Sequence, residues 1–177
     1  AIYWNPAGLS QIKKNSFSNT YTVWLADTRY NFLAFATPVE KVGIIGASVT
    51  ALTMPQTEIT TLEKPDGTGL WFDAGDWAVS LAYARQLYER EGGTRLSFGI
   101  NTKFIYQKIY RESAKGVAVD VGTLYYTGWR SLRIGMCLSN FGPDMSFSGP
   151  DLKTGAQIGG TERFAEYEPF PDTTNPN

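Results

Sequence analysis

The sequence predicts an all-β fold, an antiparallel transmembrane β-barrel of which about seven strands are present, with an N-terminal hatch segment. Large apolar residues alternate with small residues along much of the chain, and a period of two gives a strand two different faces. Several alternating stretches reach ten residues or more, which suits a tilted membrane strand. From the third stretch onward, long connections mostly alternate with short ones, as at the two edges of an outer-membrane barrel.

The clearest strand covers residues 77–84. A soluble sheet with one wet face would more often carry Lys, Glu and Thr opposite its apolar residues. A small and almost uncharged face instead favours a barrel wall with lipid outside and a crowded or wet lumen inside. The large residues are Trp77, Val79, Leu81 and Tyr83, and they alternate with Ala78, Ser80, Ala82 and Ala84.

Six further strands are expected, the first two with less regular alternation. A complete bacterial barrel has an even number of strands and closes on itself, so seven strands and a loop predict an open half, whose remainder either is missing here or comes from a partner. The first residues, 1–6, indicate a processed or truncated product. We expect a hatch or plug segment in residues 1–15, barrel strands in 16–141 and a long extracellular loop in 142–177, which is rich in Gly, Pro, Asp and Thr. The six strands are expected at residues 16–24, 29–37, 42–54, 95–108, 116–126 and 131–141.

The connections predict which edge of the barrel faces outward. Short turns are expected at 38–41, 89–93 and 127–130, facing the periplasm. The stretch 55–75 is long and polar and is expected outside, and 110–115 is intermediate. The connection at 25–28 departs from the pattern, because it is short where a long loop is expected.

The composition excludes several classes of function. A formal net charge of −1 gives no basic field for a nucleic-acid partner, and no histidine is present for Ser–His–Asp or Cys–His catalysis or for zinc. No run of roughly 18 apolar residues occurs, so no transmembrane helix is expected. The mean hydropathy of −0.23 remains compatible with a barrel, whose alternation dilutes the apolar signal. We expect no catalysis, cofactor or metal, and a buried Cys137.

Four polar residues on the small-residue side of the strands are candidates for lining a lumen: Asn101, Lys103, Asp120 and Arg133. A charge there is costly against lipid but acceptable in a polar lumen. Lys103 and Asp120 are expected to pair if their hairpin turns near Arg111. Two interpretations stay open: a polar lining that contacts cargo, and an ion pair that fills the lumen and holds the wall, which is the commoner situation.

Two further sets of residues have a structural and a functional interpretation. The motif Asn5-Pro6-Ala7-Gly8-Leu9 suits a fixed, tight chain path. It forms either a hatch inside the barrel or a purely structural turn. Aromatic residues near strand ends form either girdles at the membrane interfaces or ordinary sheet packing. These aromatic residues are Trp71, Trp77, Tyr83, Tyr106, Tyr125, Tyr126 and Trp129.

The segment Trp4-Asn5-Pro6-Ala7-Gly8-Leu9 resembles a signature near the start of FadL-superfamily outer-membrane proteins. Further stretches resemble the PorV/PorQ family in the expected order: 24–30 (WLADTRY), 120–125 (DVGTLY), 128–135 (GWRSLRIG) and 138–143 (LSNFGP). The resemblance implies a barrel of about 14 strands with an N-terminal hatch, and this chain is similar to its first half.

By resemblance, PorV-like proteins serve type IX secretion, where they accept secreted cargo by its C-terminal signal domain and carry it to the attachment machinery. The resemblance therefore implies a bacterial outer-membrane location. It also implies outer-membrane lipid, secretion-system components and cargo proteins as partners. The alternative is FadL-like transport of hydrophobic small molecules across the outer membrane. A soluble β-sandwich binding module is disfavoured by the small-residue faces.

Overall fold

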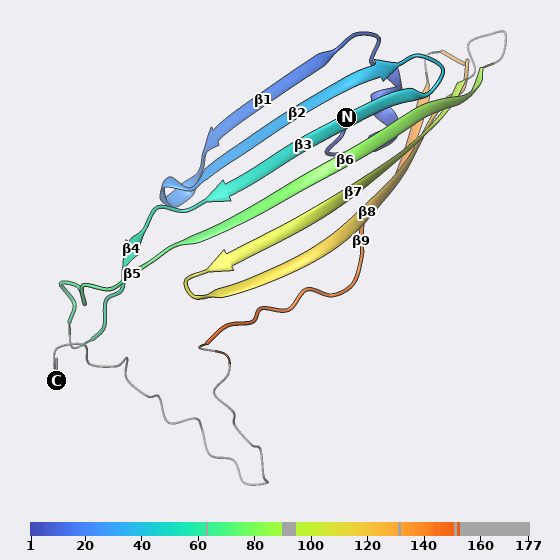
Figure 1. The fold of residues 1–177 in the computed structure, drawn as a ribbon. Coiled ribbons are helices and arrows are strands. Elements are labelled where there is room, and N and C mark those ends of the chain that lie inside the picture. Colours follow the sequence, from blue (N-terminus) through green and yellow to red (C-terminus); the bar gives the residue numbers. More distant parts are fainter. Residues whose placement is uncertain (63, 90–94, 131, 151, 153–177) are drawn as a thin grey trace, which may run out of the picture.

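The computed structural model describes residues 1–62, 64–89, 95–130, 132–150 and 152. The described residues form an all-β fold, in which seven long strands make one antiparallel sheet (Figure 1). Each long strand pairs with the next one along the chain, and the sheet curves without closing. The predicted seven strands are confirmed. They are β1 (Ser16–Val23), β2 (Arg29–Val39), β3 (Gly43–Thr53), β6 (Ala74–Glu89), β7 (Arg95–Ile109), β8 (Glu112–Tyr126) and β9 (Arg133–Phe141).

The hairpin between β7 and β8 is tighter than expected. Ile109 pairs with Glu112, so Tyr110 and Arg111 form a two-residue turn instead of an intermediate loop over 110–115. Tyr110 has a φ of 54°, the left-handed conformation that such a turn requires. The prediction was wrong because β8 starts before the regular alternation that begins at Gly116. Most of the predicted turn 89–93, and Ser131 of the last predicted strand, lie outside the described residues.

Short elements occupy some of the connections. Within residues 55–75, β4 (Thr57–Glu58) pairs with β5 (Trp71–Phe72) in a separate two-stranded sheet. The described residues also include two 3₁₀ helices, η1 (Pro6–Gln11) before β1 and η2 (Leu25–Asp27) between β1 and β2. Among the described residues, no helix combines the length and apolarity needed to cross a membrane.

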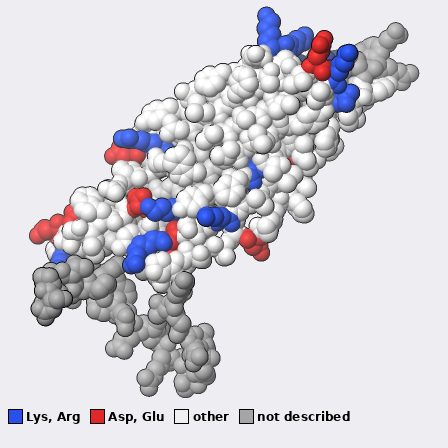
Figure 2. Space-filling view, in the orientation of Figure 1, with Lys and Arg blue, Asp and Glu red and all other residues white. Residues whose placement is uncertain are grey.

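The strand register gathers large residues on one side of the sheet, which we call the apolar face. Leu33 of β2 opposes Val49 of β3, and the row continues through Val79, Phe104 and Val117. These five side chains are 39–53% exposed. Figure 2 shows a broad, nearly uncharged surface across the middle of the sheet, with most charged side chains towards the strand ends.

The opposite side, which we call the inner face, carries the small residues. The N-terminal segment covers it: η1 contacts β6, β7 and β8, and Ile2 and Leu9 pack in one core cluster with alanines of β2 and β6 and with Ile44 of β3. A Cβ on Gly46 would meet the side chains of both Ile2 and Leu9, so the absence of a side chain there allows this close packing. One buried row of the inner face comprises Ala36, Gly46, Ala82, Asn101 and Asp120.

The chain remains beside β8 after β9 ends. Ser148 and Ser113 exchange two backbone hydrogen bonds of 2.9 and 3.0 Å. The side chain of Met145 occupies the space that a Cβ on Gly116 would need. The predicted loop 142–177 therefore begins with residues that follow the edge of the sheet, and most of it lies outside the described residues.

Cys137 is exposed, so its expected burial is wrong. It pairs with Gly122 and points to the inner face from β9, the last strand of the sheet. The N-terminal segment covers β6, β7 and β8, and no described element covers Cys137. The alternation of residues along β9 predicts which face Cys137 is on. It does not predict whether another element covers that face at the edge of the sheet.

Candidate functional site

The candidate hatch motif lies in a notch formed by two glycines. Gly99 of β7 and Gly122 of β8 are directly opposite each other. A Cβ on Gly99 would collide with the backbone of Pro6 and Ala7, and a Cβ on Gly122 with the Asn5 side chain. Only glycine permits so close an approach of backbone to backbone. Both Pro6 and Ala7 are fully buried in the notch.

Asn5 connects η1 to two strands. Its Oδ1 accepts a hydrogen bond from the Ala7 amide at 3.0 Å and caps η1. Its Nδ2 donates to the carbonyls of Thr123 on β8 and Met136 on β9, at 3.1 and 3.2 Å. Pro6 occupies the first position of η1. Proline has no backbone N–H, but an N–H at this position would find no partner within the helix, so no hydrogen bond is lost. A single side chain therefore fixes where η1 begins and which strands it contacts.

The rest of the motif holds the segment against the sheet. Leu9 is buried in the alanine-rich core, and Gly8 approaches Ala1 closely enough that a Cβ there would lie 3.1 Å from the Ala1 Cβ. The Ile12 amide donates to the Leu9 carbonyl at 2.9 Å and ends η1. The predicted tight path is thus a capped 3₁₀ helix.

Three of the four predicted polar residues form a hydrogen-bonded group with a fourth residue, Asn140, and we call this group the inner cluster. Lys103 Nζ lies 2.8 Å from Asp120 Oδ1, and the Asp120 side chain is 2% exposed. Asn101 donates to the other carboxylate oxygen of Asp120 at 2.9 Å, and Lys103 also donates to Asn140 Oδ1 at 2.6 Å. The predicted pairing of Lys103 with Asp120 is confirmed.

A β-bulge brings Asn140 into the inner cluster. The register of β8 and β9 shifts between Val119 and Val121, which leaves Asp120 facing an irregular stretch of β9. Asn140 has a φ of 58°, and its backbone amide donates to Asp120 Oδ1 at 2.8 Å. Asn tolerates this left-handed conformation better than most residues. The buried carboxylate thereby gains enough partners to offset the cost of its burial.

Arg133 lies on the inner face as predicted but away from the inner cluster. It pairs with Tyr126, the last residue of β8, and its guanidinium carbon lies 4.9 Å from the Tyr126 ring centroid. Arg95 of β7 approaches the same ring at 4.5 Å. Tyr126 is therefore on the inner face, so of its two predicted alternatives the girdle at a membrane interface is wrong for this residue, and packing within the sheet remains.

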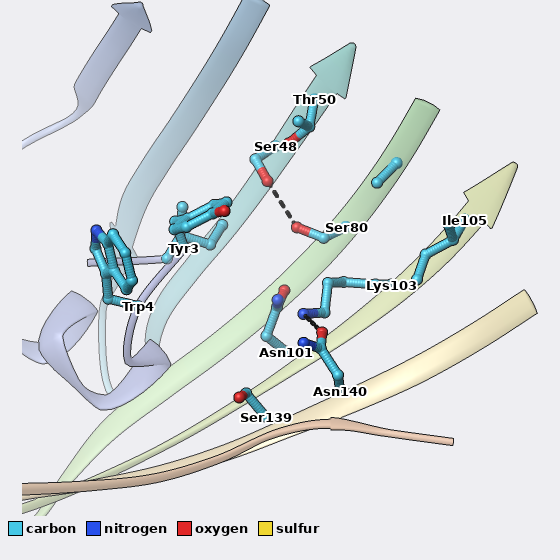
Figure 3. A pocket seen from close by; sticks show the side chains of 12 residues that line it. Tyr3, Trp4, Ser48, Thr50, Ser80, Asn101, Lys103, Ile105, Ser139 and Asn140 are labelled. Atoms are coloured by element: carbon cyan, nitrogen blue, oxygen red, sulfur yellow. Dashed lines mark hydrogen bonds between the residues drawn. The ribbon is translucent and has the colours of Figure 1, made fainter. Parts of the chain in front are cut away.

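A cavity of about 330 Å³ opens above the inner cluster. Tyr3 and Trp4 stand on one side of it, opposite polar residues of the sheet (Figure 3). Ser48 and Ser80 share a buried hydrogen bond of 2.7 Å at its floor. The buried Asn101 Oδ1 has no hydrogen-bond partner within the described part of the chain. The cavity thus offers hydrogen-bonding groups and an ammonium for binding a ligand.

A second, more apolar cavity of about 670 Å³ lies on the other side of Tyr3 and Trp4. Aromatic residues line it: Tyr3 and Trp4 of the N-terminal segment, Trp24 between β1 and η2, and Tyr30 and Phe32 of β2. Sequence reasoning missed both cavities, because it treated Trp4 only as part of a family signature and assigned no role to Tyr3. A signal for the cavities was available in the sequence. Two large aromatic residues precede a motif that packs on small residues, and such large side chains can hold the segment away from the sheet beside the motif.

The described residues contain no group of three or more His, Cys, Asp or Glu side chains that could hold a metal ion. Comparison with known proteins gave no match to any protein-family model, curated protein or solved structure. The functional conclusion therefore depends on the fold, on the two faces of the sheet and on the motifs themselves.

Proposed function

We propose that residues 16–141 form half of the wall of a transmembrane β-barrel in a bacterial outer membrane, with residues 1–15 as a hatch inside it. The exposed apolar face carries this proposal. Its large side chains run in a continuous row from β2 to β8. Extended exposed apolar surfaces mark membrane or protein interfaces. In the proposed barrel, lipid covers this face.

The position of the N-terminal segment supports lipid contact over a soluble sandwich. A sandwich buries its large inward-facing residues against a second sheet. Here the N-terminal segment covers the small residues, and no element of the described chain covers the apolar face. Lys103 and Asp120 are on the covered side, where the proposed barrel keeps them away from hydrocarbon.

Strand length and aromatic placement also support a membrane span. Strand β6 has 16 residues, and β7 and β8 have 15 each, whereas a tilted strand crosses a bilayer with about 9–11 residues. Trp77 opposes Tyr106 near one end of the apolar face, and Tyr125 lies near the other end. Aromatics at both ends suit the two membrane interfaces.

Closure would come from further strands. Each of β1 and β9 pairs with one neighbour in the described residues, and unpaired strand edges are costly in lipid. A second set of about seven strands would pair with both edges and give an even number. The membrane proposal is tested by expressing the protein with its native flanking sequence in Gram-negative cells. We expect it to stay in the membrane after carbonate and urea washes, and solubility without detergent would contradict the proposal.

For its task, we propose a PorV-like role in protein secretion, in which the barrel receives secreted cargo without catalysing a reaction. The ordered motifs of residues 4–143 support this role. The polar inner cluster and its cavity supply binding groups on the side that would face the lumen. Detergent-solubilised protein is expected to retain secreted proteins that carry a C-terminal signal domain and to release the same proteins when the domain is deleted. Equal recovery of both forms, or of neither, would contradict the role.

The aromatic-lined cavity favours a second candidate, FadL-like transport of hydrophobic small molecules. Its volume of about 670 Å³ and its mostly apolar walls suit an acyl chain or a similar ligand. This candidate predicts that acyl lipids co-purify with the protein and are lost when Trp24→Ala opens the cavity. Trp71→Ala, in β5 and outside the cavity, is the matched control. Purified protein without bound lipid would contradict this candidate.

A further inference from the structure

A third cavity, of about 260 Å³, gathers positive charge on the inner face. It lies between the end of the N-terminal segment and the strand ends that carry Arg95 and Arg133. Lys13 also lines it, and no Asp or Glu does among the described residues. The inner cluster, the apolar face and the aromatic-lined cavity do not include these three cations.

Tyr126 lies between two of the cations in the strand register, opposite Arg95 of β7 and Arg133 of β9. The guanidinium carbons of Arg95 and Arg133 lie 4.5 and 4.9 Å from the centroid of its ring. They are therefore no farther from each other than the sum of those distances. Cation–π contact with one ring orders both side chains, but it leaves their mutual repulsion in place. An anion bound in the cavity that both guanidinium groups line would offset that repulsion.

The cavity also has an excess of hydrogen-bond donors. The buried Arg95 Nε–H has no acceptor within the described part of the chain, and a buried donor without an acceptor is costly. Ser10 from η1 and the buried Ser97 from β7 add hydroxyl groups to the walls. Donors from β7, β9 and the N-terminal segment thus converge on one volume.

We propose that this cavity binds a phosphate group. Guanidinium groups donate paired N–H bonds to phosphate oxygens, and Lys13 adds a third positive charge. The cavity offers hydrogen-bond donors from two guanidinium groups, one ammonium and two hydroxyls. These are more donors than the two oxygens of a carboxylate can accept, whereas a tetrahedral phosphate has more oxygens to accept them. The phosphate is either a free anion or part of a lipid headgroup. This inference stands on the cationic cavity alone and does not require the secretion or transport proposals.

The test titrates the full-length protein in non-ionic detergent with inorganic phosphate by calorimetry, in a buffer free of other oxyanions. A parallel arm measures binding to phosphatidylcholine nanodiscs with and without phosphatidic acid. Response to inorganic phosphate identifies a free anion, and response only to phosphatidic acid identifies a headgroup. In either arm, Arg95→Gln and Arg133→Gln are each expected to weaken binding about tenfold or more.

Arg85→Gln is the matched control, because Arg85 is exposed on the neighbouring strand β6 and does not line the cavity. It removes the same charge and is expected to leave binding unchanged. Arg95→Lys keeps the charge but loses the paired donors, so intermediate binding is expected. Circular dichroism checks that each variant keeps its strand content. The proposal is overturned if wild-type protein binds neither probe, if Arg95→Gln binds like wild type, or if acetate binds as tightly as phosphate.

Discussion

Gly99 and Gly122 face each other across β7 and β8, and the Asn5-Pro6-Ala7 chain occupies the space above both. At Gly99 backbone lies against backbone, so neither side can move aside as a flexible side chain would. At Gly122 the space is filled by the Asn5 side chain, which its hydrogen bonds hold in place. The location of the N-terminal segment thus depends on two residues about a hundred positions away in the chain. The predicted hatch motif therefore packs directly on glycines of the small-residue face.

Adding a single methyl group at either glycine is expected to displace the N-terminal segment. Gly99→Ala and Gly122→Ala should each destabilise the docked segment by about 1–3 kcal/mol, the usual cost of overpacking. Hydrogen exchange at the Gly8 and Ile12 amides, which are hydrogen-bonded within the segment, should then become faster. Gly135→Ala is the control, since its Cβ would make an ordinary contact of 3.5 Å. Unchanged exchange in both notch variants would contradict the notch.

Asn5 is expected to stabilise the segment through both ends of its amide. Asn5→Ala removes the cap on η1 and the two bonds to strand carbonyls, and a loss of about 1–2 kcal/mol is expected. Asn5→Asp keeps an acceptor for the Ala7 amide but cannot donate to Thr123 or Met136. We expect Asn5→Asp to accelerate hydrogen exchange in η1 as well. Exchange equal to wild type in Asn5→Asp would show that only the cap matters.

The Lys103–Asp120 pair is expected to be strongly coupled. Lys103→Met leaves the buried Asp120 charge without its cation and should cost about 3 kcal/mol in urea unfolding. Combining it with Asp120→Asn should recover part of that loss, because the unpaired charge disappears. The exposed pair of Lys108 and Asp73 is the control, and breaking it should cost about 0–1 kcal/mol. Additive effects of the two inner-face substitutions would contradict the coupling.

The strands could be predicted because their signal is local. Alternation along 42–54 and 95–108 identifies two faces without reference to any other part of the chain. The same pattern placed Lys103 and Asp120 on one face, and a short hairpin then brings them opposite. The two-residue strands β4 and β5 were missed, because such short strands show no period.

The remaining parts depend on distant partners. Asn140 joins the inner cluster through a bulge, which arises from the register between two strands and not from the residues of either one. Arg133 is on the same face as Asp120 but pairs with Tyr126, six positions further along β8, so it is too far along the strands to join the cluster. Cys137 is exposed because it lies on the last strand. The structure of η1 likewise requires glycines on β7 and β8.

The central claim, that the apolar face contacts lipid and the inner face does not, is tested most directly at two adjacent residues of β3. Val49 lies in the exposed apolar row, and Thr50 lines the cavity above the inner cluster. In a Cys137→Ser background, Val49→Cys and Thr50→Cys are each placed in the full-length protein in native membranes. We expect a lipid-soluble maleimide to label Val49→Cys and a small water-soluble thiosulfonate to label Thr50→Cys. Labelling of Val49→Cys by the water-soluble reagent as readily as Thr50→Cys would contradict the claim.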